Sequence, residues 1–229
     1  TLIGNEFYPI KTGKEATVFV CEAGPAVDAN MVAAKVYHTG NVRSFQNDAA
    51  YREGRFVGDS RLRRAMKKKT RTGRRASLTH WVVQEYEVLS LLHARGADAP
   101  EPLAFAGGER LMAGFQEGGF GPGAILMEYV GDQHGPSPLL KDVKLDPSAA
   151  QATFDQVMRN VELFLENHIV HGDLSPFNVL YDRGGATIID FPQSVDARAN
   201  SSSEKLLTRD VTRVCDHFAR LGIDADGRS

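Results

Sequence analysis

The run His-Gly-Asp-Leu-Ser-Pro-Phe-Asn at residues 171–178, with Asp190 twelve residues after Asn178, limits the folds open to this chain more than any other feature. Asp173 could orient or deprotonate an attacking hydroxyl, while Asn178 and Asp190 offer the oxygen donors that a hard divalent cation prefers. These are the groups that phosphoryl transfer to a hydroxyl requires. The pattern therefore predicts a phosphate-transferring active site rather than a polar surface loop.

Two short apolar runs between Asn178 and Asp190 indicate how these side chains meet. Residues 179–181 and 186–189 are apolar and rich in β-branched side chains, and Asp-Arg-Gly-Gly at residues 182–185 separates them. This pattern predicts a β-hairpin. Because Asn178 precedes the first strand and Asp190 follows the second, the hairpin would place Asn178 beside Asp190.

The first half of the sequence alternates like an antiparallel sheet. Strands are predicted at residues 6–10, 16–21, 31–37, 103–105 and 124–129. A helix is predicted from His80 to Arg95, with Gly96 ending it. The turn Thr12-Gly13-Lys14-Glu15, between the first two strands, offers backbone N–H groups to a phosphate.

Lys35 lies inside an apolar strand, where a cation is costly unless it is paired. Glu85 falls on the apolar face of the predicted helix, three residues after Val82 and four before Leu89. A Lys35–Glu85 ion pair would satisfy both charges and orient the lysine onto nucleotide phosphates. The competing interpretations are an ion pair with a structural role only, and a lysine whose charged end reaches solvent.

The second half is predicted to be mostly helical. Asp146 and Pro147 begin one helix as N-cap and first helical residue. A last helix begins with Ser201 and Glu204, which are spaced as a capping box. The apolar positions that predict its core face are Leu207, Val211, Val214, Phe218 and Leu221. We therefore expect a nucleotide lobe at residues 1–130 and a catalytic lobe at residues 131–229.

Charge is unevenly spread along the sequence. The net charge is −2, but residues 61–75 hold nine Lys or Arg side chains and no acidic one. We expect a flexible basic loop at about residues 58–77. It is either a solvated basic face or a docking segment for an acidic or phosphate-rich partner, RNA being one candidate.

Composition indicates an ordinary globular protein of the cytoplasm. Cys21 and Cys215 lie far apart and form no metal-ligand spacing, which favours a reducing compartment. No apolar run approaches the roughly 20 residues that span a bilayer, so no membrane contact is expected.

Several of these motifs together resemble the RIO family of atypical serine/threonine protein kinases. They are Thr12 to Ala16, Lys35, Glu85, Met127-Glu128-Tyr129, His171 to Asn178, and Ile189-Asp190 to Gln193. The resemblance extends from about Glu6 to Leu221. It implies an α+β, two-lobed protein-kinase-like fold with an antiparallel five-stranded N-lobe, one main N-lobe helix and a small, mostly helical C-lobe.

The resemblance also implies site roles. Asp173 would be the catalytic base, Lys35 would bind ATP phosphates, and Glu85 would hold Lys35. Asn178 and Asp190 would ligate Mg²⁺, with Mn²⁺ as a second candidate ion. The other expected nucleotide contacts come from Thr12, Gly13, Lys14, Glu15, Val18, Ala33, Met127, Glu128, Tyr129, Leu180 and Ile189. The acceptor would be a protein hydroxyl, including hydroxyls of the protein itself.

Length distinguishes this pattern from that of an ordinary protein kinase. Only 39 residues follow Asp190, so an activation segment and a substrate subdomain are not expected. Gly172 replaces the arginine that regulated kinases place beside the catalytic aspartate. Two other functions use the same residues: an ATPase-type nucleotide switch that gates partner binding, and a small-molecule phosphotransferase resembling the aminoglycoside and choline kinases.

Overall fold

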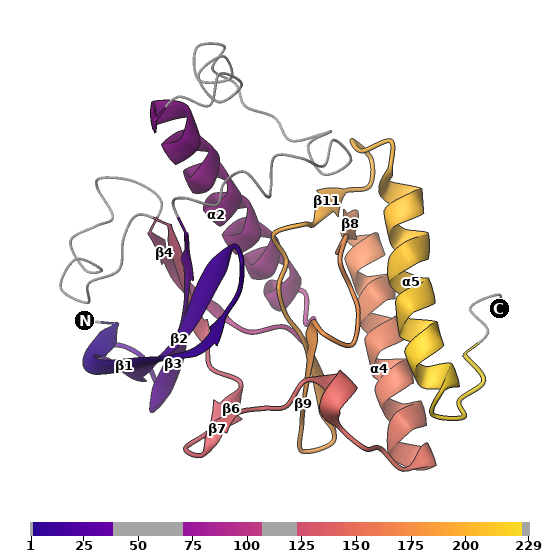
Figure 1. Ribbon diagram of the computed structural model, residues 1–229. Helices are drawn as coiled ribbons and strands as arrows, with labels where there is room; N and C mark the ends of the chain where they lie inside the picture. Colours follow the sequence, from indigo (N-terminus) through magenta and orange to yellow (C-terminus); the bar gives the residue numbers. More distant parts are fainter. Residues whose placement is uncertain (1, 39–70, 107–122, 226–229) are drawn as a thin grey trace. The chain divides into compact units, whose positions relative to one another are not determined.

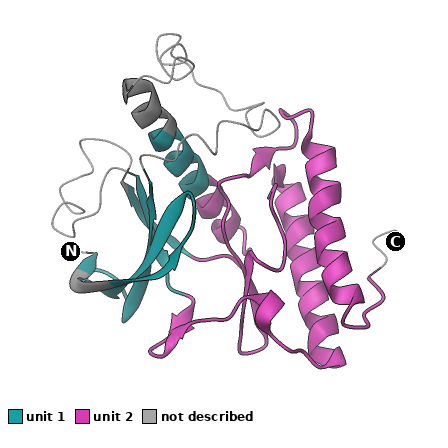
Figure 2. Cartoon of the chain, in the orientation of Figure 1, with its two compact units in different colours: residues 1–49, 56–87, 101–129 teal, residues 50–55, 88–100, 130–229 magenta. Residues whose placement is uncertain are grey.

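The computed structural model describes residues 2–38, 71–106 and 123–225. The protein forms two compact units: unit 1 falls within residues 1–49, 56–87 and 101–129, and unit 2 within residues 50–55, 88–100 and 130–229 (Figure 2). Helix α2 (Arg71–Ala94) contributes to both, because the division falls between Glu87 and Val88. Within the described ranges, no helix is both long and apolar enough to cross a membrane.

Unit 1 is built on a five-stranded antiparallel sheet in the order β1-β2-β3-β5-β4 (Figure 1). Its strands are β1 (Ile3–Thr12), β2 (Ala16–Ala23), β3 (Met31–Tyr37), β4 (Pro102–Ala106) and β5 (Ala124–Glu128). The predicted antiparallel sheet is therefore confirmed. One face buries a core around Cys21, Val32, Ala34 and Leu126. The other face packs against Leu78, Trp81 and Val82 of α2.

Helix α2 is longer than its apolar pattern predicts. It ends as expected, because Gly96 adopts a left-handed φ of +85° that a Cβ would strain. It begins at Arg71 rather than at His80, so the loop expected at about residues 58–77 is wrong for residues 71–77. The rest of the basic segment, residues 61–70, lies outside the described residues.

Unit 2 contains two long helices, α4 (Pro147–Glu166) and α5 (Ser203–Ala219), which lie side by side (Figure 1). The rings of Phe154 and Phe218 join them, with centroids 5.4 Å apart. The N-cap of α4 is as predicted, since Asp146 Oδ1 accepts the Ala149 N–H at 2.9 Å. The short elements of unit 2 are β6 (Gly131–Asp132), β7 (Gly135–Pro136), η2 (Leu140–Asp142), β8 (Ile169–Val170), β9 (Val179–Asp182), β10 (Gly185–Ile188) and β11 (Val195–Asp196).

The start of α5 differs from the predicted capping box. Ser202, not Ser201, is the N-cap, and its side chain forms no cap hydrogen bond. The acceptor comes instead from the buried Asn200, whose Oδ1 accepts the Ser202 N–H at 2.8 Å. The buried face of α5 consists of Leu206, Asp210, Val214 and Phe218. The predicted positions Leu207, Val211 and Leu221 are only partly buried.

Candidate active site

Four of the expected nucleotide contacts share one face of the unit 1 sheet. In the β2–β3 register Val18 lies opposite Lys35, and in the β3–β5 register Ala33 lies opposite Met127. Directly opposed residues project from the same face, as do Ala33 and Lys35, two positions apart on β3. Val18, Ala33, Lys35 and Met127 therefore lie on one side of the sheet, the side that packs on α2.

The ion pair expected between Lys35 and Glu85 is present. Lys35 Nζ lies 2.7 Å from Glu85 Oε1, and the side chains are only 10% and 3% exposed. The Tyr37 hydroxyl donates to the second carboxylate oxygen, Oε2. Both carboxylate oxygens of Glu85 thus have a partner, and these two contacts fix the position of the carboxylate that pairs with the Lys35 ammonium.

Replacing Glu85 by glutamine is expected to destabilise unit 1. Lys35 would lose the carboxylate 2.7 Å away while remaining buried, and breaking a buried ion pair costs about 3 kcal/mol. Urea unfolding would measure the change. Glu87→Gln is the matched control, because Glu87 is exposed on the same helix. Equal free energies of unfolding for the two variants would contradict the stabilising role of the pair.

The predicted turn Thr12–Glu15 joins β1 to β2. The Gly13 N–H donates to the Ala16 C=O at 2.9 Å, so this N–H is engaged within the turn and is not offered to a phosphate as expected. His38 fixes the turn from outside it, because its backbone N–H donates to the Glu15 C=O at 2.8 Å. His38 is not among the residues predicted from the sequence. It follows β3, and only the register of β3 on β2 brings it to the turn.

At the end of β5 the backbone N–H of Glu128, one of the expected nucleotide-contacting residues, already has a partner. The Glu128 N–H donates to the Glu101 C=O at 2.8 Å, and Glu128 Oε2 accepts the Glu101 N–H at 3.1 Å. The Glu128 N–H is thereby committed within unit 1. Contacts to an adenine ring would have to come from the Glu128 C=O and from Tyr129.

In unit 2 the strand β8 leads directly into the catalytic loop, which we define as residues 171–178. The His171 ring is buried, and Nε2 lies 3.2 Å from the Ile189 C=O. The Asp173 N–H donates to Nδ1 at 3.2 Å. Because Nδ1 accepts a hydrogen bond, it carries no hydrogen. Nε2 therefore carries the hydrogen and donates to the Ile189 C=O, so the imidazole is neutral. Burial lowers the pKa of His171, in agreement with that state.

Stability is therefore expected to decrease on acidification. Folding lowers the pKa of His171 below its ordinary value of 6.5, so the unfolded protein binds this proton more readily. The contribution is complete above that ordinary value and is lost as the pH falls from it through the lower pKa of the folded state. Burial lowers the pKa of His217 with the same sign. Urea unfolding at about pH 7.5 and about pH 5.5 should give a smaller free energy at the lower pH, and His171→Gln should reduce the difference. A wild-type protein more stable at the lower pH would contradict this.

The predicted hairpin is confirmed, with β9 and β10 paired antiparallel. The open end of this hairpin brings the backbone beside Asn178 close to the backbone before Asp190, because the Ile189 N–H donates to the Asn178 C=O at 3.0 Å. Leu180 faces Thr187 across the hairpin and forms a bridge with Leu139. Asp190 follows with a φ of +73°, a left-handed conformation that few residues other than glycine adopt, although aspartate tolerates it better than most. Strained backbone of this kind is concentrated at functional sites.

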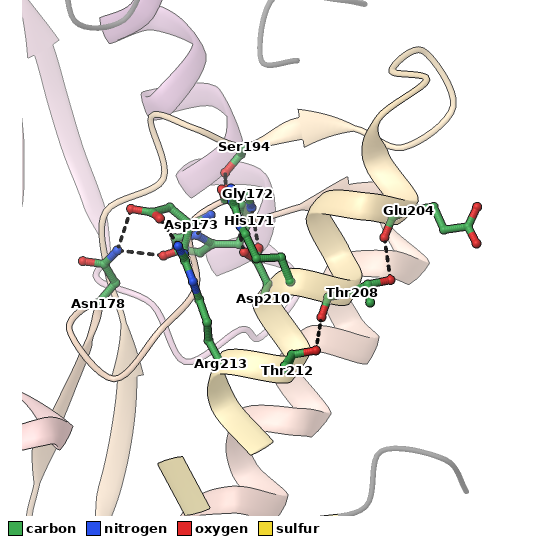
Figure 3. Close-up of polar contacts among 11 residues, drawn as sticks. His171, Gly172, Asp173, Asn178, Ser194, Glu204, Thr208, Asp210, Thr212 and Arg213 are labelled. Carbon is green, nitrogen blue, oxygen red and sulfur yellow. Dashed lines mark hydrogen bonds and ion pairs between the residues drawn. The ribbon is translucent and has the colours of Figure 1, made fainter. Parts of the chain in front are cut away.

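The donor chemistry at the hairpin base fits a divalent cation. Asn178 Nδ2 donates to the Asp173 C=O at 2.9 Å and lies 3.5 Å from Asp173 Oδ2 (Figure 3). Because the nitrogen is committed to the loop, the amide presents its oxygen on the other side. That oxygen and the Asp190 carboxylate are the hard donors that magnesium takes. In the described part of the protein no three His, Cys, Asp or Glu side chains gather into a metal cluster.

Helix α5 holds the catalytic loop, an arrangement that the sequence patterns do not predict. Asp210 Oδ2 accepts the Gly172 N–H at 2.7 Å, and Arg209 donates to the Gly172 C=O. Arg213 Nη1 donates to Asp173 Oδ1 at 2.9 Å. Asp210 is 2% exposed, and burial raises the pKa of its carboxyl. The sequence places no arginine next to Asp173, but the fold does.

The two units together have the elements of a protein-kinase-like fold. Comparison with known proteins identifies the family to which the chain belongs. The family model described as RIO domain matches residues 17–228. A RIO-type serine/threonine-protein kinase Rio1 of Thermoplasma acidophilum is 31% identical over 85% of this chain and 88% of its own length. The chain therefore belongs to the RIO family of atypical serine/threonine protein kinases.

Eukaryotic relatives are longer than this chain. The serine/threonine-protein kinase rio1 of Schizosaccharomyces pombe is 30% identical over 93% of this chain, and the match spans 38% of that relative. The human serine/threonine-protein kinase RIO1 is 29% identical over 93% of this chain, and the match spans 33% of it. The match thus spans about a third of each of these two proteins.

Proposed function

We propose that this chain transfers the γ-phosphate of ATP to a serine or threonine hydroxyl of a protein, with Asp173 as the catalytic base. The observation that carries the proposal is the catalytic loop. Its half-exposed Asp173 lies beside Asn178, at the base of the hairpin that ends before Asp190. A carboxylate that accepts a hydroxyl proton must be reachable by the acceptor, and this one is 47% exposed.

The atoms of the reaction balance without a further reactant. The acceptor oxygen bonds to the γ-phosphorus, and the bond from that phosphorus to the β–γ bridging oxygen breaks. ADP leaves, and the acceptor proton passes to the Asp173 carboxylate. Lys35 holds the phosphates, and Glu85 fixes Lys35 through their 2.7 Å contact.

ATP would be used with Mg²⁺, Mn²⁺ being the second candidate, and Asn178 and Asp190 would hold the ion. When bound, the ion supplies positive charge that neutralises the β- and γ-phosphates. Two protein donors leave most of its coordination sphere to phosphate and water, so the metal should bind weakly without nucleotide.

The nucleotide contacts are proposed for both units. In unit 1 the backbone of Thr12–Glu15 would contact phosphate, while the sheet face and the β5 end would contact the base. In unit 2, Leu180 and Ile189 would contribute apolar surface. We accordingly propose residues 1–130 as the nucleotide lobe and residues 131–229 as the catalytic lobe.

We also propose a first substrate, a partner and a location. Self-phosphorylation is the first activity to look for, since the protein itself supplies serine and threonine. The basic segment at residues 61–75 is proposed to dock an acidic partner or RNA by a salt-dependent contact. The cytoplasm is the proposed location.

The test is incubation with γ-labelled ATP and magnesium, followed by separation of labelled protein, labelled small molecules and free phosphate. Labelled protein in excess of free phosphate is the expected result. Free phosphate alone would favour a nucleotide switch, and a labelled small molecule would favour a small-molecule phosphotransferase. Either outcome would overturn the proposed activity.

A further inference from the structure

Arg213 is the one residue of α5 whose side chain reaches the catalytic carboxylate itself among the described contacts. Its Nη1 lies 2.9 Å from Asp173 Oδ1, and Figure 3 shows the side chain extending from the helix to the loop. Both side chains are partly open to solvent, at 42% and 47% exposure. An ion pair so exposed contributes little to stability. Its main effect is therefore on the position of the carboxylate.

The neighbouring contacts fix the relative position of arginine and aspartate. Arg209, one helical turn before Arg213, donates to the Gly172 C=O, and Asp210 accepts the Gly172 N–H at 2.7 Å. Gly172 itself adopts a left-handed φ of +79°. Gly172 is thus bound to α5 through both its N–H and its C=O. These bonds fix the backbone directly before Asp173, the residue that Arg213 contacts.

The two oxygens of Asp173 have different surroundings. Oδ1 accepts from Arg213 at 2.9 Å, whereas Oδ2 has only the long 3.5 Å contact from Asn178 Nδ2. Holding one oxygen fixes the rotation of the carboxylate and presents the other. Orientation of this kind is worth a large part of the rate in group transfer, because a displacement of about 1 Å can cost about a hundredfold.

The loop lacks a cation of its own. No Lys or Arg occurs in residues 171–178, although negative charge is spread over the phosphoryl oxygens during transfer. The guanidinium of Arg213 has five N–H donors, and within the described residues Asp173 is its only hydrogen-bond partner. The remaining N–H groups can donate to a phosphoryl oxygen beside the catalytic carboxylate.

We propose that Arg213 is a positioning residue for phosphoryl transfer, which holds Asp173 through Oδ1 so that Oδ2 faces the acceptor hydroxyl, and which supplies the positive charge that the loop lacks. This inference rests on the proposed kinase activity. It adds to that activity a residue far from the catalytic loop in sequence.

The test compares initial rates of protein phosphorylation for the wild type, Arg213→Gln and Arg213→Lys. Arg213→Gln is expected to lower kcat by about tenfold to a hundredfold, with ATP affinity changed by less than about twofold. Arg213→Lys should recover part of the rate, since it keeps the charge but loses the planar fork. Arg220→Gln removes the same charge from the exposed C-terminal end of α5 and should keep the wild-type rate.

Chemical rescue separates positioning from folding. Methylguanidinium should raise the rate of an Arg213→Ala protein, because it can occupy the vacated space beside Asp173. No rescue, or an Arg213→Gln rate equal to or above that of the wild type, would overturn the inference while leaving the proposed function standing. A wild-type protein that phosphorylates no protein would instead overturn the proposed function, and the inference with it.

Discussion

Replacing Asp173 by asparagine is expected to lower phosphoryl transfer by about a hundredfold or more while ATP still binds. Asparagine keeps the shape of the side chain, and its amide oxygen can still accept from Arg213. It cannot take up the proton of the acceptor hydroxyl. The loss should therefore fall on kcat, with the KM for ATP close to that of the wild type.

Labelled-phosphate transfer and nucleotide titration would measure the two effects separately. Asp216→Asn is the matched control, because Asp216 is an exposed aspartate of α5. An Asp173→Asn protein with a rate within a few-fold of the wild type would exclude Asp173 as the base.

Replacing Asp190 by asparagine is expected to remove the magnesium dependence of ATP binding. Asparagine tolerates the left-handed φ of +73° at this position, so the backbone is preserved while the charge is lost. Loss of a metal ligand should weaken the magnesium-dependent affinity for ATP by at least about tenfold. Even the replacement of a group that only supports a ligand typically lowers metal affinity by that factor.

Calorimetric titration of ATP, with magnesium and with a chelator, would measure this effect. The wild-type affinity should fall when the metal is removed, whereas the affinity of the variant should be the same in both conditions. An Asp190→Asn protein that retains the wild-type response to magnesium would assign the metal to other residues.

The parts of the site that depend on neighbours in sequence could be predicted. The hairpin from Val179 to Ile188 is one example, since a short Gly-rich turn between two apolar runs leaves few other conformations. A hairpin at these residues places Asn178 and Asp190 at the same end of its two strands. The turn at Thr12–Glu15 is a second example, and there too the strands on both sides determine the geometry.

Glu85 and Asp210 show how far one rule extends. Glu85 was found because a carboxylate on an apolar helix stripe needs a partner. Asp210 lies on such a stripe as well, four residues from both Leu206 and Val214. The sequence pattern does not predict its burial, because Leu207 and Val211 place the expected apolar stripe one residue further along α5. A shift of one residue along the helix removed the buried acid from the predicted core face.

The contact of Arg213 with Asp173 could not be read from the sequence. Arg213 is exposed and lies on the polar side of its helix, where arginine is ordinary. The two residues are 40 positions apart, and only the packing of unit 2 brings them together. The same holds for His38, which reaches the Glu15 C=O through strand register alone.

The binding of Gly172 by α5 determines which positions can vary. Arg209 and Asp210 hold the loop through the backbone carbonyl and N–H of one residue, not through loop side groups. These two bonds do not depend on the identity of exposed neighbours such as Phe177, which is 60% exposed. Substitutions at such exposed positions leave both backbone bonds in place, whereas Asp210 is needed as an acceptor and the φ of +79° at residue 172 favours glycine. Divergent copies of this sequence could thus change the surface presented to an acceptor while retaining the same catalytic geometry.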